Sequence, residues 1–373
     1  MRMFNRFYGL CAVAVCSILY TAWFLTGRTF GDVVPLAGTF QTADKFNHRL
    51  VVFGDSWSDS ETEEEQGKIW TDHLCDLFSC YQENLAQTAR SAGNTKKNIG
   101  AVVDNEELNS FGMLSKDQVP DFKTQLDQWL AAETVAMEKL TEEERITRQE
   151  RTTFVISFGI WDLWSLRETD YNTAIASVDR RIKKLTEQLN RLDESFKSWG
   201  STELQIIMTQ TMDVTFLPAF TSAEGDEFKD AVRLLTEWNS RLKSAATEWK
   251  DGKAQWLYMF DTNAFVLDRI RDWQLYASGI EEENGMGKNI EPGWENVSGP
   301  CVVVQSGFRV MMSRAEEKTR CQRPEKYLFW DEMHLGPSAH KLMGSAVYKE
   351  TKELLNAAPS KSESAASRRG AAV

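Results

Sequence analysis

Histidine and basic charge are both scarce in this chain of 373 residues. It contains only four His, and its 43 Lys and Arg are outnumbered by 55 Asp and Glu, which gives a formal net charge of −12. Binding to nucleic acid requires a concentrated basic face that neutralises phosphates. No run of Lys and Arg in the body of the chain supplies such a face, so the sequence predicts no nucleic-acid partner.

The chain also lacks the tight Cys and His spacing of zinc sites, and we expect neither a metal nor an organic cofactor. Six Cys are present. Two of them, Cys11 and Cys16, lie in an apolar N-terminal segment. The other four form two locally close pairs, and in an oxidising compartment the economical choice among three pairings is Cys75–Cys80 with Cys301–Cys321.

Long apolar runs are absent except at the N-terminus, where residues 7–27 carry no charge between Arg6 and Arg28. About 20 apolar helical residues cross a bilayer, and the following "PLAG" at 35–38 is a poor cleavage signal. We therefore expect a retained membrane anchor over 1–28, with the body in the secretory lumen or outside the cell. The alternative is a removed signal peptide and a secreted body.

The rest of the chain divides into three parts. Residues 29–47 are expected to be a linker, 48–358 a globular domain, and the low-complexity stretch 359–373 a disordered tail. Asn296 begins the only glycosylation sequon, "NVS", in a Gly-rich stretch, and we expect it to carry a glycan. The oligomeric state is not predicted.

Strands and helices alternate along the body. Four apolar runs are predicted to be strands: 48–56, 152–164, 203–213 and 254–263. Between them, apolar residues recur at helical spacing over 175–199 and 228–249. This order predicts an α/β fold with a parallel sheet covered on both faces. A charged stretch at 131–151 is expected to be a solvated helical face.

Ligands of such sheets bind beyond the carboxyl ends of the strands, where Ser56, Asp162 and Asp213 are predicted to lie. Ser56 ends the strand in "VVFGDSWSDSE", and a serine hydroxyl needs a base to become a nucleophile. Asp55 is expected to brace this turn through backbone N–H groups, whereas Asp59 is expected to be solvated or turn-forming.

One of the four His is placed to be that base. His48 starts the strand that ends at Ser56, His73 lies in a predicted helix, and His340 is predicted to lie inside a helix as a structural residue. In "DEMHLGPSAH", however, Asp331 precedes His334 by three residues. Asp331 is thus placed to orient the imidazole, and His334 to transfer the proton.

The blocks "FGDSWSDSE" and "DEMHLGPSAH" together resemble those of the SGNH hydrolases, also called GDSL-type esterases and lipases, especially fungal and plant-like members. The resemblance spans residues 48–350. It implies a three-layer α/β/α sandwich with a mostly parallel, flavodoxin-like sheet. It also implies that Ser56 is the nucleophile and that the Ser56 N–H helps to bind the oxyanion.

Two family blocks depart from the pattern. Where the family has Gly-x-Asn-Asp, this chain has "GIWD", so Gly159 and Asp162 align but Trp161 replaces the oxyanion-binding Asn. The block that supplies a backbone donor matches "ENLAQTARSAGN", which puts its Gly position near Ala89, with Gly93 as an alternative. An indole N–H and the N–H of a non-glycine residue can both donate, and we treat Asp55, Gly159 and Asp162 as supporting residues.

Three functions follow as hypotheses. The first is hydrolysis of a lipid or carbohydrate ester, small or polymeric, through an acyl-serine and without a cofactor. The second is a membrane-anchored polysaccharide O-acetyltransferase, which passes the acyl group to a sugar hydroxyl. The third, favoured only by the missing Asn, is a relative that binds glycan or lipid without turnover.

Overall fold

The structure is a computed structural model that describes residues 48–60, 66–90, 98–108, 119–200, 204–220, 225–280, 293–305 and 317–356. The N-terminal segment predicted over 1–28, the linker over 29–47 and the tail over 359–373 lie outside the described residues. Within the described part of the chain, no helix has both the length and the apolar character to cross a membrane.

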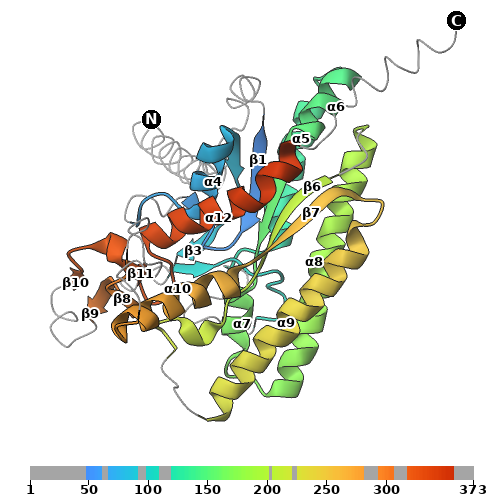
Figure 1. Cartoon of the computed structure of the whole chain (residues 1–373). Coiled ribbons are helices and arrows are strands. Elements are labelled where there is room, and N and C mark those ends of the chain that lie inside the picture. The colour runs from blue at the N-terminus through green and yellow to red at the C-terminus, as the bar shows by residue number, and fades with distance from the viewer. Residues whose placement is uncertain are drawn as a thin grey trace, which may run out of the picture. The chain divides into compact units, whose positions relative to one another are not determined.

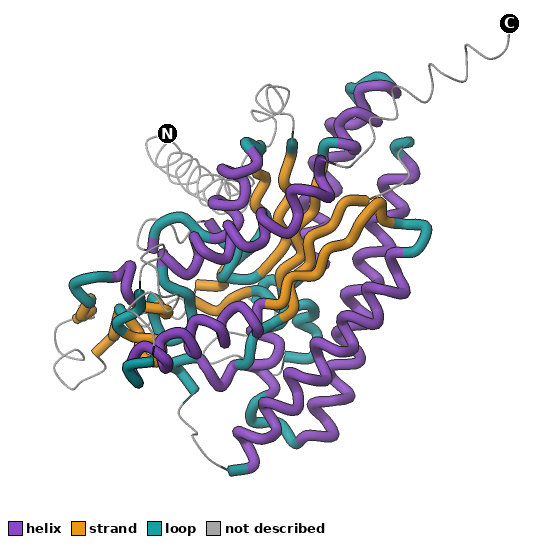
Figure 2. The backbone as a smooth tube through the Cα atoms, in the orientation of Figure 1, coloured by secondary structure: helices purple, strands orange, loops and turns teal. Residues whose placement is uncertain are grey.

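Five parallel strands form the central sheet (Figures 1 and 2). In spatial order they are β2 (Tyr81–Asn84), β1 (Arg49–Gly54), β5 (Thr152–Ser157), β6 (Leu204–Gln210) and β7 (Ala254–Asp261). Numbered along the chain, this order is 2-1-3-4-5, the flavodoxin-like arrangement. Every residue of β1 and β5 is buried, as continuous apolar strands between two helical layers must be.

One face of the sheet is covered by three helices: α5 (Phe122–Met137), α8 (Tyr171–Ser198) and α9 (Asp226–Lys250). The apolar stripes at 175–199 and 228–249 are the buried sides of α8 and α9, which pack side by side (Figure 1). Phe53 of β1 lies at the centre of this layer, with ring centroids 5.5 Å from Phe122, 6.1 Å from Trp129 and 6.2 Å from Phe154. The predicted three-layer α/β/α sandwich is confirmed.

On the other face, α4 (Trp70–Phe78) packs along α12 (Pro337–Asn356), and α10 (Thr262–Ala277) follows β7. Gly344 makes the close approach of α4 and α12 possible. A Cβ at this position would lie 2.5 Å from the Trp70 carbonyl oxygen and 2.8 Å from His73 Cβ.

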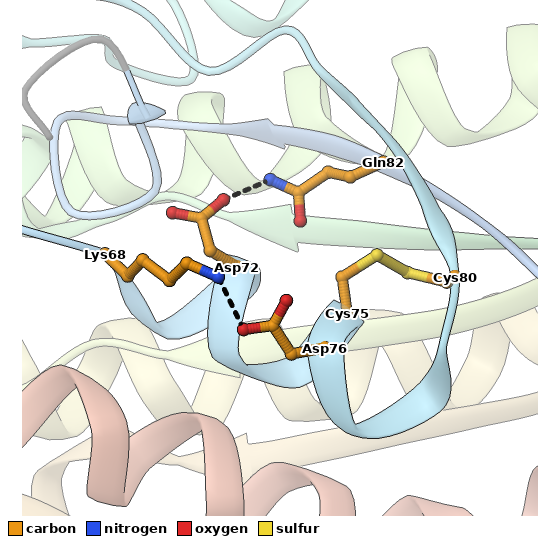
Figure 3. Close-up of a disulfide and its surroundings, with 6 residues drawn as sticks. All are labelled: Lys68, Asp72, Cys75, Asp76, Cys80 and Gln82. Carbon is orange, nitrogen blue, oxygen red and sulfur yellow. Dashed lines mark hydrogen bonds and ion pairs between the residues drawn. A yellow bond between two sulfur atoms is a disulfide. The ribbon is translucent and has the colours of Figure 1, made fainter. Parts of the chain in front are cut away.

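Both predicted disulfides are present. Cys75–Cys80 ties the end of α4 to the start of β2, beside the Lys68–Asp76 ion pair and the Gln82–Asp72 hydrogen bond (Figure 3). Cys301–Cys321 joins the hairpin of β9 (Val302–Gln305) and β10 (Glu317–Arg320) at its base.

The remaining short elements surround the carboxyl edge of the sheet or connect the layers. They are β3 (Thr88–Arg90), β4 (Asn98–Gly100), α6 (Glu142–Glu150), α7 (Ile160–Leu166), η4 (Val214–Phe216), β8 (Asn296–Pro300), η5 (Pro324–Lys326) and β11 (Tyr327–Phe329). β3 pairs with β4 antiparallel, and β8 pairs with β11 parallel.

The predicted strand over 152–164 is too long. β5 ends at Ser157, and Gly159, with φ +131°, begins α7 as its N-cap. A non-glycine residue is strained at this φ, so the glycine forces the change from strand to helix. Trp161 and Asp162 therefore lie in the first turn of a helix.

The stretch 131–151 is not one solvated helix. α5 ends at Met137, and a capping box between Thr141 and Glu144 starts α6. Glu133 is only 2% exposed, because Arg49 and Arg148 both donate to its carboxylate. Glu83 of β2 also accepts from Arg49, so a buried ion network closes the amino-terminal edge of the sheet.

Candidate active site

The turn that carries Ser56 is fixed to its neighbours by backbone contacts. Gln125 of α5 clamps Gly54, accepting from its N–H at 2.9 Å and donating to its carbonyl at 2.8 Å. The Asp55 N–H donates to the Ser157 carbonyl at 3.1 Å, which continues the β1–β5 pairing. Ser56 is therefore held at the carboxyl edge of the sheet, with 2% of its surface exposed.

His334 joins Ser56 to Asp331. Its Nε2 lies 2.8 Å from Ser56 Oγ, and its Nδ1 lies 2.8 Å and 2.9 Å from the two Asp331 carboxylate oxygens. An ionised carboxylate only accepts, so Nδ1 carries the proton and Nε2 is left to accept from the serine hydroxyl. This arrangement holds His334 in the tautomer that can take a proton from Ser56.

The charges at this site reinforce the arrangement. Burial acts to lower the pKa of His334, but the Asp331 carboxylate, helped by Asp55 and Asp59, outweighs it and the pKa is raised. Burial acts to raise the pKa of Asp331, yet His334 and the backbone N–H groups of Met333 and His334 hold it below its usual value. Asp331 thus stays ionised while His334 holds a proton readily.

The hairpin closed by Cys301–Cys321 positions the turn that carries this pair. The Cys301 N–H donates to the Phe329 carbonyl at 3.0 Å, and the Val302 N–H donates to the Trp330 carbonyl at 2.7 Å. Trp330 immediately precedes Asp331, and its own N–H donates to the His334 carbonyl at 2.8 Å. The disulfide is therefore connected to Asp331 and His334 through consecutive backbone hydrogen bonds.

Trp161 contacts the predicted nucleophile directly. Its Nε1–H donates to Ser56 Oγ at 2.8 Å, and its side chain is buried. Ser56 Oγ thus accepts from the indole while its own proton points to His334 Nε2. A donor in this position favours negative charge on the serine oxygen as the proton leaves.

Gly100, at the end of β4, is a residue that the sequence analysis missed. A Cβ on Gly100 would lie 2.2 Å from Trp161 Nε1 and 2.7 Å from the Ser56 backbone nitrogen. Only a glycine at position 100 leaves room for both the Trp161 indole and the Ser56 backbone. The signal in the sequence is "NIGAVVDN", but no local pattern marks its glycine as a neighbour of Ser56.

The sequence predicts that the backbone N–H near Ala89 helps to bind the oxyanion, and the β3–β4 register shows where this N–H points. Ala89 pairs with Ile99, and Ala101 N–H donates to the Gln87 carbonyl. Because pairs alternate in an antiparallel ladder, the Ala89 N–H points into that ladder and the Gly100 N–H points away from it. Gly93, the alternative, lies outside the described residues.

Asp162 contacts the segment that follows Gly100. Its carboxylate accepts the Val103 N–H at 3.1 Å and faces Arg181, whose Nη1 lies 3.2 Å away. Burial raises the pKa of Asp162 to about 6, although Arg181 acts in the opposite direction. Asp162 therefore fixes the segment that follows Gly100.

Asp55 makes the expected bracing contact, since its Oδ1 accepts the Trp57 N–H at 3.0 Å. Burial raises its pKa to about 7, the Trp57 N–H and His334 act to lower it, and Asp162 acts to raise it. Of the two roles expected for Asp59, the solvated one is wrong, because Asp59 is 4% exposed. Its charge acts on His334.

The other candidates have separate positions. Asp213 caps η4, where its carboxylate accepts the Thr215 N–H at 2.9 Å. His340 is fully buried next to Gln66 and accepts the Trp70 N–H at 3.3 Å; burial lowers its pKa to about 3, so it is a neutral structural residue. His48 precedes β1, at the opposite edge of the sheet from Ser56.

Among the described residues, no group of three or more His, Cys, Asp or Glu could hold a metal ion. Asn296 begins β8 in a side-chain-capped turn, with its Oδ1 accepting the N–H groups of Ser298 at 2.9 Å and Gly299 at 2.7 Å. Glycosylation of Asn296 stays a prediction.

In comparisons with known proteins, no family model and no curated protein matches this chain.

Proposed function

We propose that the chain is a serine ester hydrolase of the SGNH, or GDSL, type, acting on a carboxylic ester of a lipid or carbohydrate. The observation that carries this proposal is the continuous relay from Ser56 Oγ through His334 to Asp331, with contacts of 2.8–2.9 Å. Two residues brought together from opposite ends of the domain, at hydrogen-bond distance and in the productive tautomer, are the signature of an activated nucleophile.

The mechanism follows from these contacts. Ser56 Oγ attacks the acyl carbon and forms the new C–O bond, while its proton moves to His334 Nε2. His334 then gives this proton to the departing alcohol oxygen, which leaves an acyl-serine. Water attacks the acyl carbon while its proton moves to His334 Nε2. His334 then returns this proton to Ser56 Oγ as the C–O bond to the serine breaks, which releases the acid and regenerates the Ser56 hydroxyl.

Three N–H groups are proposed to stabilise the oxyanion: the backbone N–H groups of Ser56 and Gly100, and the indole Nε1–H of Trp161. The support is their close grouping, since a Cβ built on Gly100 would lie 2.2 Å from Trp161 Nε1 and 2.7 Å from the Ser56 nitrogen. Trp161 thereby takes the role of the Asn that this family otherwise uses. The indole contact with Ser56 Oγ weighs against a relative that only binds its ligand.

We also infer that the body works in an oxidising compartment, the secretory lumen or the outside of the cell. Its two disulfides support this, because such bonds persist mainly in secreted and luminal proteins.

Hydrolysis of p-nitrophenyl acetate and butyrate by the purified full-length protein tests the proposal. Turnover should fall to background in Ser56→Ala and His334→Ala. It should be unchanged in Ser345→Ala, an exposed serine on α12. Equal rates in all four proteins would refute it. An added sugar acceptor that diverts the acyl group from free acid to sugar ester would instead favour the acetyltransferase.

A further inference from the structure

A small cavity lies beneath the turn that carries Ser56. Its volume is about 20 Å³, and it is bounded by the carboxyl ends of β1, β5 and β6 together with α10 and α12. The polar groups that line it include Asp55, Ser157, Thr209 and Thr262, and Met343 lies on its apolar side. A water molecule needs about 10–15 Å³ of such space, so the cavity is large enough for one.

Thr262, the first residue of α10, leaves a hydroxyl unsatisfied in this region. The residue is 4% exposed, and its Oγ1 is buried without a hydrogen-bond partner among the described groups. An unpaired buried hydroxyl is unfavourable, and native proteins normally supply a partner or an ordered water. Because Thr262 lines the cavity, a molecule inside the cavity can be that partner.

The other polar groups complement the same molecule. The Thr209 hydroxyl donates to Ser157 Oγ at 3.0 Å, which leaves the Ser157 proton available to a further acceptor. Asp55 accepts only the Trp57 N–H among the contacts described above, and a carboxylate has room for several more donors. A cavity lined by both hydroxyl donors and a carboxylate acceptor suits a water molecule, which both accepts and donates.

We propose that this cavity binds one structural water molecule, which links the Asp55 carboxylate to the Thr262 hydroxyl and so positions the turn that carries Ser56. Thr262 is then a positioning residue, 206 residues from the serine that it supports. The existence of the water does not depend on the proposed function, whereas its effect on catalysis does.

The water also affects the charges near the nucleophile. A hydrogen bond donated to Asp55 favours its ionised form. The groups that face Asp55 are Asp162 on α7 and His334 before α12, and an ionised Asp55 raises the pKa of His334. Loss of the water therefore raises the pKa of Asp55, and the smaller charge on Asp55 lowers the pKa of His334.

Crystal structures of the full-length wild type, Thr262→Val and Thr262→Ser test the binding site. Thr262→Val keeps the shape of the side chain and removes the hydroxyl, whereas Thr262→Ser keeps the hydroxyl. We expect one water in the wild type and in Thr262→Ser, about 2.5–3.0 Å from the hydroxyl oxygen at position 262, and none in Thr262→Val. An empty wild-type cavity would overturn the proposal. So would a metal ion with five or more oxygens at about 2.3–2.6 Å. The wild-type crystal decides this even if a variant does not fold.

The pH profile of ester hydrolysis tests the positioning role. In Thr262→Val we expect kcat to fall about fivefold and the acid limb of kcat/KM to move to lower pH by about 0.3 units, as the charge of Asp55 is lost. Thr262→Ser should restore both values. A Thr262→Val profile that overlies the wild type would remove the positioning role. An inactive wild type with an ordered water would refute the proposed function and leave the water site standing.

Discussion

The indole Nε1–H of Trp57 donates to the backbone carbonyl of Met333 at 2.8 Å. Trp57 directly follows Ser56, and Met333 directly precedes His334, so this one hydrogen bond joins the two turns of the proposed active site. The residues are 276 positions apart in the chain. The Trp57 side chain is 4% exposed, which protects the bond from exchange with water.

Without this hydrogen bond, the distance between Ser56 and His334 should vary more. Trp57→Phe keeps an aromatic ring but has no N–H. A hydrogen bond of this kind contributes about 1 kcal/mol, so we expect kcat for p-nitrophenyl acetate to fall about 5- to 10-fold with little change in KM. Trp199→Phe, the C-cap residue of α8 just before β6 at the opposite edge of the sheet, serves as the control. A Trp57→Phe variant with wild-type kcat would show that the bond does not hold the two turns together.

The pH dependence of kcat/KM should report His334. The base must be neutral to take the Ser56 proton, so activity rises with pH through the pKa of His334. This pKa is raised above 6.5, chiefly by Asp331 against the effect of burial, so the midpoint of the acid limb should lie above 6.5. Asp331→Asn removes the charge and the tautomer control. It should lower both the midpoint and kcat, the latter about 10³- to 10⁴-fold. An unchanged midpoint in Asp331→Asn would exclude the pairing.

The proposed oxyanion donors are tested by Trp161→Phe and Gly100→Ala. The first removes the indole N–H, and the second places a methyl group 2.2 Å from it. Loss of one oxyanion donor costs about 100- to 1,000-fold in kcat, and we expect losses of this size from Trp161→Phe. Gly100→Ala should lose at least as much, because it also displaces the Ser56 backbone. Thermal unfolding checks that both variants are folded, and full activity in Trp161→Phe would assign the oxyanion to other groups.

The buried ion network at the far edge of the sheet predicts an acid-labile component of stability. Arg49 and Arg148 outweigh the effect of burial and lower the pKa of Glu133 from 4.5 to about 2. A lowered carboxylate pKa stabilises the fold above pH 4.5, and this contribution is lost as the pH falls towards 2. Glu133→Gln leaves two buried guanidinium groups short of a partner.

Urea unfolding should therefore show Glu133→Gln to be less stable than the wild type by about 3 kcal/mol at pH 7. The difference should shrink between pH 4.5 and 2. Glu138→Gln, an exposed residue directly after α5, should change stability by less than about 0.5 kcal/mol. Equal stability of Glu133→Gln and wild type at pH 7 would contradict the stabilising role of the ion pairs between Glu133 and the two arginines.

Local patterns predicted the central part of the fold. The apolar runs of β1 and β5 and the helical periodicity of α8 and α9 are properties of consecutive residues, and the structure has all four elements. Asp331 and His334 were also found together because they are three residues apart on one turn. This spacing alone predicts that the two side chains lie close to each other.

Properties that depend on tertiary contacts were missed. β2 has the polar sequence YQEN and carries no strand pattern. Its Glu83 is buried because Arg49 and Trp129, from other elements, donate to its carboxylate. Glu133 seemed to belong to a solvated face for the same reason. Gly100 has no local signal either, since what requires a glycine there is the approach of Trp161 and Ser56, which lie far away in the sequence.

The most direct test of the account is covalent labelling of Ser56. The full-length protein would be treated with a fluorophosphonate that reacts with activated serines, and the modified peptide located by mass spectrometry. We predict stoichiometric labelling of Ser56 that is abolished in Ser56→Ala and strongly slowed in His334→Ala, because the relay makes this hydroxyl nucleophilic. No labelling of the wild type, or labelling at another residue with Ser56→Ala unaffected, would contradict the proposal that Ser56 is the nucleophile of an ester hydrolase.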